Sequence, residues 1–302
     1  MVSLRQLRYF VEVVEAGSFS AAAERLFVAQ SALSRQIRDL EQSAQVVLLS
    51  RAGRQTTLTP AGRTFYDGAK RLLFGLNDTL LQARQTERGG EGIVRLVHSS
   101  SVVLGRDLLA ALQRFLDAQP GASLDVSQMT SDHQATELVE GRSDLGLVRL
   151  PVTLVHADVS VEALFDERLY LAVPPGHRLA RLPSCSLADL RDEAFVSQPH
   201  AERGGLGFRV AELCLRHGFF PRGARATSRK TTQLNLVAAG FGVSIVPDGM
   251  RLIAPPEVGF VVLNDVDAST TVGMLRRNDA AALTEACAAS LRGAAARRGA
   301  RA

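Results

Sequence analysis

Hydrophobic positions near the start of the chain repeat at the spacing of short α-helices. Leu7, Phe10 and Val14 recur at i, i+3 and i+7, as one face of a helix requires. Gly17 can end this helix in the left-handed conformation, and Ser18 can cap the next one. The pattern therefore predicts a helix that stops near Gly17 and a second, very short helix directly after it.

A third helix is predicted after a turn at residues 27–29, with Leu33, Ile37 and Leu40 as its apolar stripe. The opposite side carries amide, hydroxyl and guanidinium groups, which can read base edges and hold phosphates in a DNA major groove. The same charges would also suit an ordinary solvated helix face, and this segment alone does not separate the two interpretations. The polar positions are Gln30, Ser31, Ser34, Arg35 and Arg38.

The next stretch, RAGRQTTLTPAG, favours the DNA-binding interpretation. Gly53 suits the tip of a hairpin, and Arg51 and Arg54 stand on either side of it. A short hairpin with basic residues after a helix of this kind is typical of a wing.

From Pro60 the pattern becomes one long helix, since proline is accepted in a first helical turn. Its apolar residues are spaced by four and three, an average of 3.5, which is the seam of a paired coiled coil. We therefore expect dimerisation through this helix; the alternative is packing on the chain's own domain. The helix is predicted to end at a glycine hinge in TERGGEGI. The seam consists of Phe65, Ala69, Leu72, Leu76, Thr79 and Ala83.

After the hinge, strand and helix patterns alternate, which predicts an α/β region with a parallel sheet. Two such units are expected, and 269–277 and 279–291 are expected to return to the first. A cleft between them would bind a ligand. The first unit is predicted from IVRLVHS, SLDVSQM and DLGLVRL as strands with helices around LLAALQRFL and HQATELVEG, and the second from LYLAVPP, EAFVSQ and GVSIVP with helices at GFRVAELCLRHGF and TTQLNLVAAG.

Composition restricts the class of protein. With 46% hydrophobic and 22% charged residues, the 302-residue chain is neither disordered nor fibrous. Its apolar runs are too short to span a bilayer, and the N-terminus lacks the h-region of an export signal, so we expect a cytoplasmic protein without membrane association. Three widely spaced cysteines fit reduced thiols there.

Charge and catalytic motifs add two expectations. The net charge of +4 is a weak indication of an anionic partner, because much of the excess lies in the tail RGAAARRGARA, which we expect to be unfolded. The sequence contains no nucleophile elbow, Walker loop, HExxH or dinucleotide-binding glycine motif. We therefore expect no enzymatic activity, no metal and no cofactor.

Three motifs of the sequence resemble those of a known family. AAAERLFVAQSALSRQIRDLEQ, LTPAG and LVAAGFGVSIVP are similar to motifs of LysR-type transcriptional regulators, along the chain to about residue 290. The resemblance implies an α plus α/β protein: a winged helix-turn-helix over 1–59, a dimerising linker helix and hinge over 60–91, and over 92–302 a two-lobed α/β effector domain similar to periplasmic solute-binding proteins. We place the first lobe at about 92–161 and 268–295 and the second at about 162–267.

The resemblance also implies which residues read DNA. They are Gln30, Ser31, Ser34 and Arg35, with Arg54 of the wing directed to the minor groove. We assign base contacts to Gln30 and Arg35, and phosphate contacts to Ser34 and Arg38.

Two departures from the family pattern affect the ends of the third helix. Ala29 stands where a capping serine is usual, and a non-glycine, Gln45, stands where the helix turns left-handed. These departures put the ends of that helix in doubt.

The effector site is also predicted from the resemblance. A run of serines, Ser99, Ser100 and Ser101, is expected at the mouth of the following helix, where hydroxyl and free N–H groups suit a carboxylate. Ser131 stands at the equivalent place after the second strand. Arg149 would meet an anionic ligand or pair with an acid of the chain itself. From the second lobe, Pro199, His200 and Phe208 are expected to approach the cleft.

The stretch around Arg149 looks closest to the branch of the family that controls degradation of aromatic compounds. This similarity implies a small anionic effector such as an aromatic acid. We expect the protein to be an activator. In the expected mechanism, a DNA-bound dimer of dimers changes its arrangement when the effector binds, and RNA polymerase then engages the promoter DNA. The alternative is a solute-binding or enzymatic α/β protein whose N-terminal region only mediates association.

Overall fold

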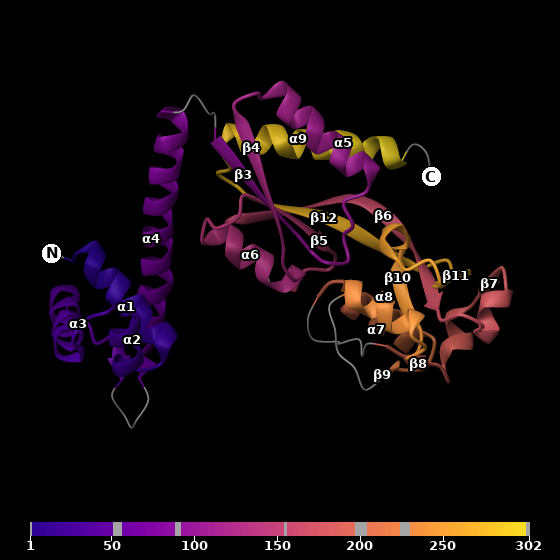
Figure 1. Cartoon of the computed structure of the whole chain (residues 1–302), viewed down its shortest axis with the longest axis horizontal. Helices are drawn as coiled ribbons and strands as arrows, with labels where there is room; N and C mark the ends of the chain where they lie inside the picture. Colours follow the sequence, from indigo (N-terminus) through magenta and orange to yellow (C-terminus); the bar gives the residue numbers. More distant parts are fainter. Residues whose placement is uncertain are drawn as a thin grey trace. The chain divides into compact units, whose positions relative to one another are not determined.

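The computed structural model describes residues 2–50, 56–87, 92–153, 156–196, 204–223 and 230–299. The chain divides into two compact units, Met1–Glu87 and Arg88–Ala302 (Figure 1). None of the helices in these ranges has the length and apolar character needed to cross a membrane.

The first two helices begin and end where the sequence predicts. α1 (Leu4–Ala16) stops at Gly17, whose φ of 69° is left-handed. Ser18 then caps α2 (Phe19–Arg25) by accepting a hydrogen bond from the backbone N–H of Ala21 at 3.2 Å.

α3 (Gln30–Ala44) has the two poorly supported ends that the sequence predicts. Ala29 at the N-cap makes no side-chain hydrogen bond, and Gln45 closes the helix in the left-handed conformation, with φ 56°. Each feature costs about 1 kcal/mol relative to a good cap. The apolar stripe must therefore hold the helix in place, and its three residues are fully buried: Leu33, Ile37 and Leu40.

A short antiparallel hairpin follows at the predicted place, between β1 (Leu49–Ser50) and β2 (Thr57–Leu58). The predicted tip residue Gly53 and the predicted wing arginines, Arg51 and Arg54, lie outside the described residues. The hairpin is thus confirmed, and its tip stays a prediction.

α4 (Pro60–Glu87) is a 28-residue helix that starts where Pro60 predicts. Its first turn is fastened to the residues before β1. The Thr59 hydroxyl donates to the Val47 carbonyl at 2.7 Å, and the Thr59 N–H donates to the Leu48 carbonyl at 3.0 Å. Gly62 lies so close that a Cβ there would be 1.9 Å from the Leu48 oxygen, so no side chain fits at this position.

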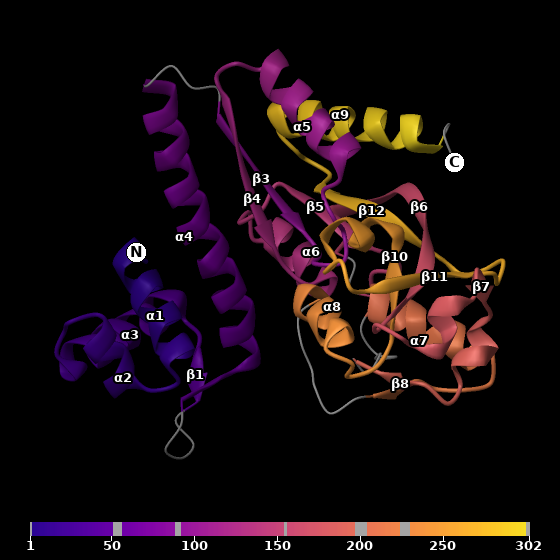
Figure 2. The ribbon, with the colours of Figure 1, turned by 45° about the vertical axis from the view of Figure 1, so that its right-hand side comes forward.

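The first lobe of the second unit confirms the predicted parallel α/β pattern. β3 (Gly92–His98) pairs in parallel with β4 (Ala122–Gln128) on one side and with β5 (Leu145–Arg149) on the other. The crossover helices are α5 (Arg106–Ala118) and α6 (Ser131–Val139). Because right-handed crossovers that run in opposite directions place their helices on opposite faces, α5 and α6 lie on either side of the sheet (Figures 1 and 2).

β6 (Val159–Val173) is one long strand that runs through both lobes. The sequence predicts only its second half as a strand, since acidic residues interrupt the apolar pattern of the first half. The first half pairs antiparallel with β12 (Ser269–Arg277), which also pairs with β5 and so returns to the first lobe as expected. The second half pairs with β10 (Ser244–Pro247) and β11 (Gly259–Leu263).

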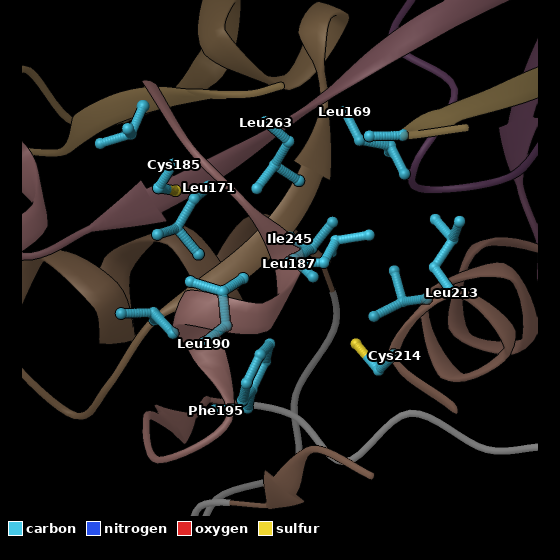
Figure 3. Close-up of a cluster of buried hydrophobic side chains, with 14 of the residues drawn as sticks. Leu169, Leu171, Cys185, Leu187, Leu190, Phe195, Leu213, Cys214, Ile245 and Leu263 are labelled. Carbon is cyan, nitrogen blue, oxygen red and sulfur yellow. The ribbon is translucent and has the colours of Figure 1, made fainter. Parts of the chain in front are cut away.

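The second lobe packs around the far half of β6. Figure 3 shows its core, in which side chains of β6, α7 and the short helical turns meet. The remaining described elements are η1 (Arg178–Arg181), β7 (Ser184–Cys185), η2 (Leu187–Leu190), β8 (Ala194–Phe195), α7 (Leu206–Arg216), β9 (Arg222–Gly223), α8 (Lys230–Ala238) and η3 (Asp248–Ile253).

The three cysteines are free and buried, which confirms the expectation of unpaired thiols. Cys185 and Cys214 belong to the core of the second lobe, and Cys287 to that of the first. Burial raises the pKa of Cys185 to about 11 and the pKa values of Cys214 and Cys287 to about 12. All three thiols therefore stay protonated near neutral pH and are poor nucleophiles.

The expectation that the C-terminal tail is unfolded is wrong over its described part. α9 (Ala282–Gly299) continues through it, with alanines buried against the first lobe. The arginines pair with acids of β6: Arg292 Nε lies 3.0 Å from a Glu162 oxygen, and Arg298 Nη2 lies 2.8 Å from Glu167 Oε1. The described part of the tail is thus helical, with alanines buried in the first lobe and two arginines paired with acids of β6.

A buried charge pair lies at the end of β5. Arg149 is 0% exposed and pairs with Glu167 through Nη2, which also donates to the Ser101 carbonyl at 2.6 Å. Burial lowers the pKa of the Arg149 guanidinium, and the Glu167 carboxylate acts in the opposite direction. Arg298 occupies the second oxygen of Glu167. Of the two roles predicted for Arg149, pairing with an acid of the same chain is confirmed.

Replacing Gly62 with alanine should unfold the N-terminal unit, because the new methyl group would overlap the Leu48 carbonyl. Gly75→Ala is the matched control: it lies in the same helix with nothing within 4 Å of its Cβ position, and should stabilise α4 by about 1 kcal/mol. Thermal unfolding followed by circular dichroism measures both, and equal melting temperatures for the two variants would contradict the close approach.

Replacing Glu167 with glutamine should destabilise the second unit by about 3–5 kcal/mol, because Arg149 would keep a buried charge without its partner. The double variant Arg149→Met, Glu167→Gln should recover much of this loss. Glu162→Gln breaks a half-exposed pair and should cost about 1 kcal/mol or less. Urea unfolding compares the three, and a Glu167 variant as stable as the Glu162 variant would refute the pairing argument.

Candidate functional site

α3 presents its polar residues on the side away from the core. Gln30, Ser31, Arg35 and Arg38 are exposed, and Ser34 is half-buried. Arg38 Nε donates to the Ser34 carbonyl at 3.3 Å, which directs its side chain along the helix. Within the described ranges neither Arg35 nor Arg38 has an ion-pair partner, so both guanidinium groups are available to an anion.

The far end of α3 is held by a residue that the sequence reasoning missed. Glu41 Oε1 accepts hydrogen bonds from the backbone N–H groups of Leu48 at 2.8 Å and Leu49 at 3.0 Å. It thereby fixes the start of the hairpin relative to the helix. One signal was available in the sequence, since an acid in the last turn of a helix is unfavourable unless it has another partner.

A second polar group fixes the long helix to α1. Glu15 accepts from the Tyr66 hydroxyl at 3.1 Å, and Lys70 Nζ lies 3.2 Å from the same carboxylate. Burial, and then the charge of Glu15, raise the pKa of Tyr66. Spacing within one helix could not have predicted this contact, because the residues are far apart in sequence.

In the second unit, the predicted serines lie together in a pocket of about 230 Å³. Its walls come from the turn after β3, from the first turn of α6 and from the first turn of α7, so both lobes contribute to it. The lining residues are Ser99, Ser100, Ser101, Thr130, Ser131, Asp132, His133, Gly204, Gly205, Leu206 and Gly207.

The expected place of the serines relative to a helix is wrong. α5 begins at Arg106 with Gly105 as its N-cap, several residues after Ser101. The serines instead form a turn of their own, in which the hydroxyls of Ser99 and Ser101 lie 2.8 Å apart and the Ser101 N–H donates to Ser99 Oγ at 3.3 Å. Val102, Val103 and Leu104 lie between this turn and the N-cap Gly105.

Two other helices direct their N-termini at the pocket. α6 begins at Ser131 and α7 at Leu206, and neither N-cap residue, Thr130 or Gly205, makes a side-chain capping bond. Helix N-termini carry partial positive charge and free N–H groups, so both favour an anion. The Ser131 hydroxyl accepts from the backbone N–H of Arg149 at 3.2 Å, which connects the pocket to the buried charge pair.

An acid also lines the pocket. Burial acts to raise the pKa of Asp132, but hydrogen bonding from Thr130 and the charge of His133 outweigh it and lower that pKa. His133 Nδ1 lies 3.2 Å from the Asp132 carboxylate and 3.0 Å from the Thr130 hydroxyl. The anion-favouring part of the pocket is therefore the side formed by the serines and α7.

The structure does not bring all the predicted effector residues to this pocket. Arg149 is enclosed, pairs with Glu167 and does not line the pocket, so its contact with a ligand stays a prediction. The lining residues of α7 end at Gly207, one residue before Phe208. Pro199 and His200 lie outside the described residues.

Comparisons with known proteins agree with this architecture. The family "Bacterial regulatory helix-turn-helix protein, lysR family" matches residues 4–63, and "LysR substrate binding domain" matches residues 87–296. The chain is 34% identical to the uncharacterized HTH-type transcriptional regulator YnfL of Escherichia coli strain K12, over 88% of this chain and 89% of the relative. It is 32% identical to the HTH-type transcriptional regulator ClcR of Pseudomonas putida, over 92% of this chain and 94% of the relative.

A solved structure extends the similarity to the whole fold. Full-length CbnR, crystallised in complex with its target DNA, superimposes with a TM-score of 0.74 at 30% identity, over 97% of this chain and 100% of that chain. Since both family models match and the relatives are similar over nearly their full length, the chain belongs to the LysR family of transcriptional regulators, with an N-terminal helix-turn-helix domain and a two-lobed substrate-binding domain.

Proposed function

We propose that this protein is an effector-responsive activator that binds double-stranded promoter DNA through α3 and the wing. One observation carries the proposal: α3 is anchored by a fully buried stripe and presents an exposed face of glutamine, serine and unpaired arginine. The related CbnR was solved with its target DNA bound, which supports DNA binding by this chain.

The polar residues of α3 divide by chemistry into base readers and phosphate binders. Gln30 suits a bidentate contact with adenine and Arg35 a bidentate contact with guanine, each worth about 1–3 kcal/mol of discrimination. Ser31, beside Gln30, lies on the same exposed side. Ser34 and Arg38 fix the register on phosphates. Arg54 of the wing enters the minor groove in this proposal.

Dimerisation through α4 is the second part of the proposal. A groove of about 820 Å³ runs between the start of α1 and the first half of α4 and is lined almost wholly by apolar residues, among them Phe65, Ala69 and Leu72. Leu72 is 62% exposed in the single chain. A second copy of α4 would cover this seam, and a dimer of dimers would bind two half-sites.

The domain limits that follow are 1–59 for DNA binding, 60–91 for dimerisation and 92–302 for regulation. They are in keeping with the ranges of the two family matches, 4–63 and 87–296.

The pocket of the second unit is the proposed effector site. Serine hydroxyls and two helix N-termini favour a small carboxylate, an aromatic acid included, whose acid group would lie beside Ser99 and Ser100 and away from Asp132. Because both lobes line the pocket, a bound effector changes their relation and favours one arrangement of the tetramer, with a coupling of about 1–3 kcal/mol. RNA polymerase then engages the promoter, in the cytoplasm.

A solute-binding or enzymatic protein is the weaker candidate, because it gives the helix-turn-helix no purpose beyond association. A chain truncated to begin at Gly92 that kept every activity of the full chain would favour this alternative.

Arg35→Ala should cost about 1–3 kcal/mol in operator affinity and relax specificity at one base pair, since it removes a bidentate contact. Arg38→Ala should weaken binding to all sequences alike and reduce the slope of log Kd against log salt by about 1, since it removes a phosphate contact. Fluorescence anisotropy on a duplex selected by the wild-type chain measures both. Unchanged operator binding by Arg35→Ala would contradict the assignment of this face.

A carboxylate effector at about a hundredfold its Kd should stabilise the second unit by about 2.7 kcal/mol. A thermal-shift screen of the full chain against small carboxylates, aromatic acids included, detects this as a rise in melting temperature. Ser100→Ala should abolish the rise, whereas Ser127→Ala, an exposed serine of β4 away from the pocket, should leave it intact. A shift that persists in the Ser100 variant would place the ligand elsewhere.

A further inference from the structure

We propose that Phe27, in the turn between α2 and α3, is a DNA-contacting residue whose ring packs on apolar C–H surface of the duplex at the edge of the major groove. This inference rests on the proposed DNA binding by α3 and adds a residue to it.

The turn places Phe27 outside the core by its backbone conformation. Its φ of 54° is left-handed, and the N–H groups on either side are fixed, with Phe27 donating to the Glu24 carbonyl at 3.2 Å and Val28 donating to Ala23 at 3.0 Å. Both neighbours, Leu26 and Val28, pack against the core of the N-terminal unit. A single left-handed residue lets both reach inward, so whatever stands at position 27 must point outward.

Phenylalanine is an unfavourable choice for such a position. The left-handed region suits glycine and asparagine and is strained for a bulky side chain. The Phe27 ring is also 96% exposed, so it gains nothing from burial within the described chain. The fold explains why the residue at position 27 is left-handed and points outward, but it does not explain why this residue is aromatic.

The surroundings of the ring indicate its partner. Phe27 stands three residues before Gln30, and the large exposed side chains on the first turns of α3 are polar or basic, namely Gln30, Ser31 and Arg35, with only the small Ala29 and Ala32 exposed among them. An apolar protein surface would leave these groups unpaired, whereas DNA offers phosphates for the arginine, base edges for the amide, and apolar C–H groups of deoxyribose and thymine methyl for the ring.

The test replaces Phe27 with asparagine, which tolerates the left-handed conformation. The full-length variant should melt at or above the wild-type temperature, while its Kd for a duplex selected by the wild-type chain from a random pool rises about tenfold. Because the ring carries no charge, the salt dependence of Kd should stay unchanged. Gln45→Asn is the matched control, since Gln45 is left-handed at the other end of α3, and it should bind DNA as the wild type does.

Replacing thymine by uracil in the duplex distinguishes the two apolar surfaces. If the ring contacts a thymine methyl group, uracil should weaken DNA binding by the wild type but should not change DNA binding by the Phe27 variant. If the ring contacts deoxyribose, uracil should change the Kd of both proteins by the same factor. A Phe27→Asn variant that binds within twofold of the wild type would overturn the inference while leaving DNA binding by α3 intact. If the wild-type chain enriches no sequence from the pool, the proposed function itself fails, and the inference with it.

Discussion

The second unit is organised around the charge of Arg149, which lies in the interior and needs a partner there. An unpaired buried guanidinium costs several kcal/mol, so Glu167 has to face Arg149, and this fixes which residues of β6 point inward. The other oxygen of Glu167 takes Arg298, which holds the end of α9 against the same strand. The Ser101 carbonyl also accepts a hydrogen bond from the Arg149 side chain and so connects the serine turn to this pair. Four segments that are distant in sequence, namely β5, β6, α9 and the serine turn, thus share one electrostatic requirement.

The buried charge of Arg149 also fixes one wall of the pocket. Ser101 is tied to the Arg149 side chain, and Ser131 accepts from the Arg149 backbone, so both serine segments are positioned by one residue of β5. The opposite wall is the start of α7, which belongs to the second lobe. β6 and β12 join the lobes. A ligand that touched only the first wall would bind every arrangement of the lobes equally and shift none, so a regulatory effector has to contact both.

Local patterns predicted the elements, and longer-range electrostatics explains most of what they missed. Gly17, Ser18 and Pro60 act within a few residues, so their turns and helix starts could be predicted. The continuous β6 could not be predicted, because its acids interrupt the apolar pattern and their partners, Arg149, Arg292 and Arg298, lie far away in the sequence. The helical tail was missed for the same reason. The site was predicted in part: spacing placed Ser99 and Ser131 after strands, but no local signal showed that α5 starts late or that Arg149 turns inward.

In the N-terminal unit, the stability of α3 and its proposed function place opposite demands on the first turn of this helix. A capping oxygen before Gln30 would satisfy the free N–H groups within the protein, and Ala29 provides none. These donors and the partial positive charge of the helix end therefore remain available to a phosphate. DNA bound there would satisfy them, so that part of the stability missing from the free helix is recovered on binding. A helix held by its buried stripe, Leu33, Ile37 and Leu40, and by Glu41 at its far end can keep an uncapped start of this kind and still present it in a fixed direction.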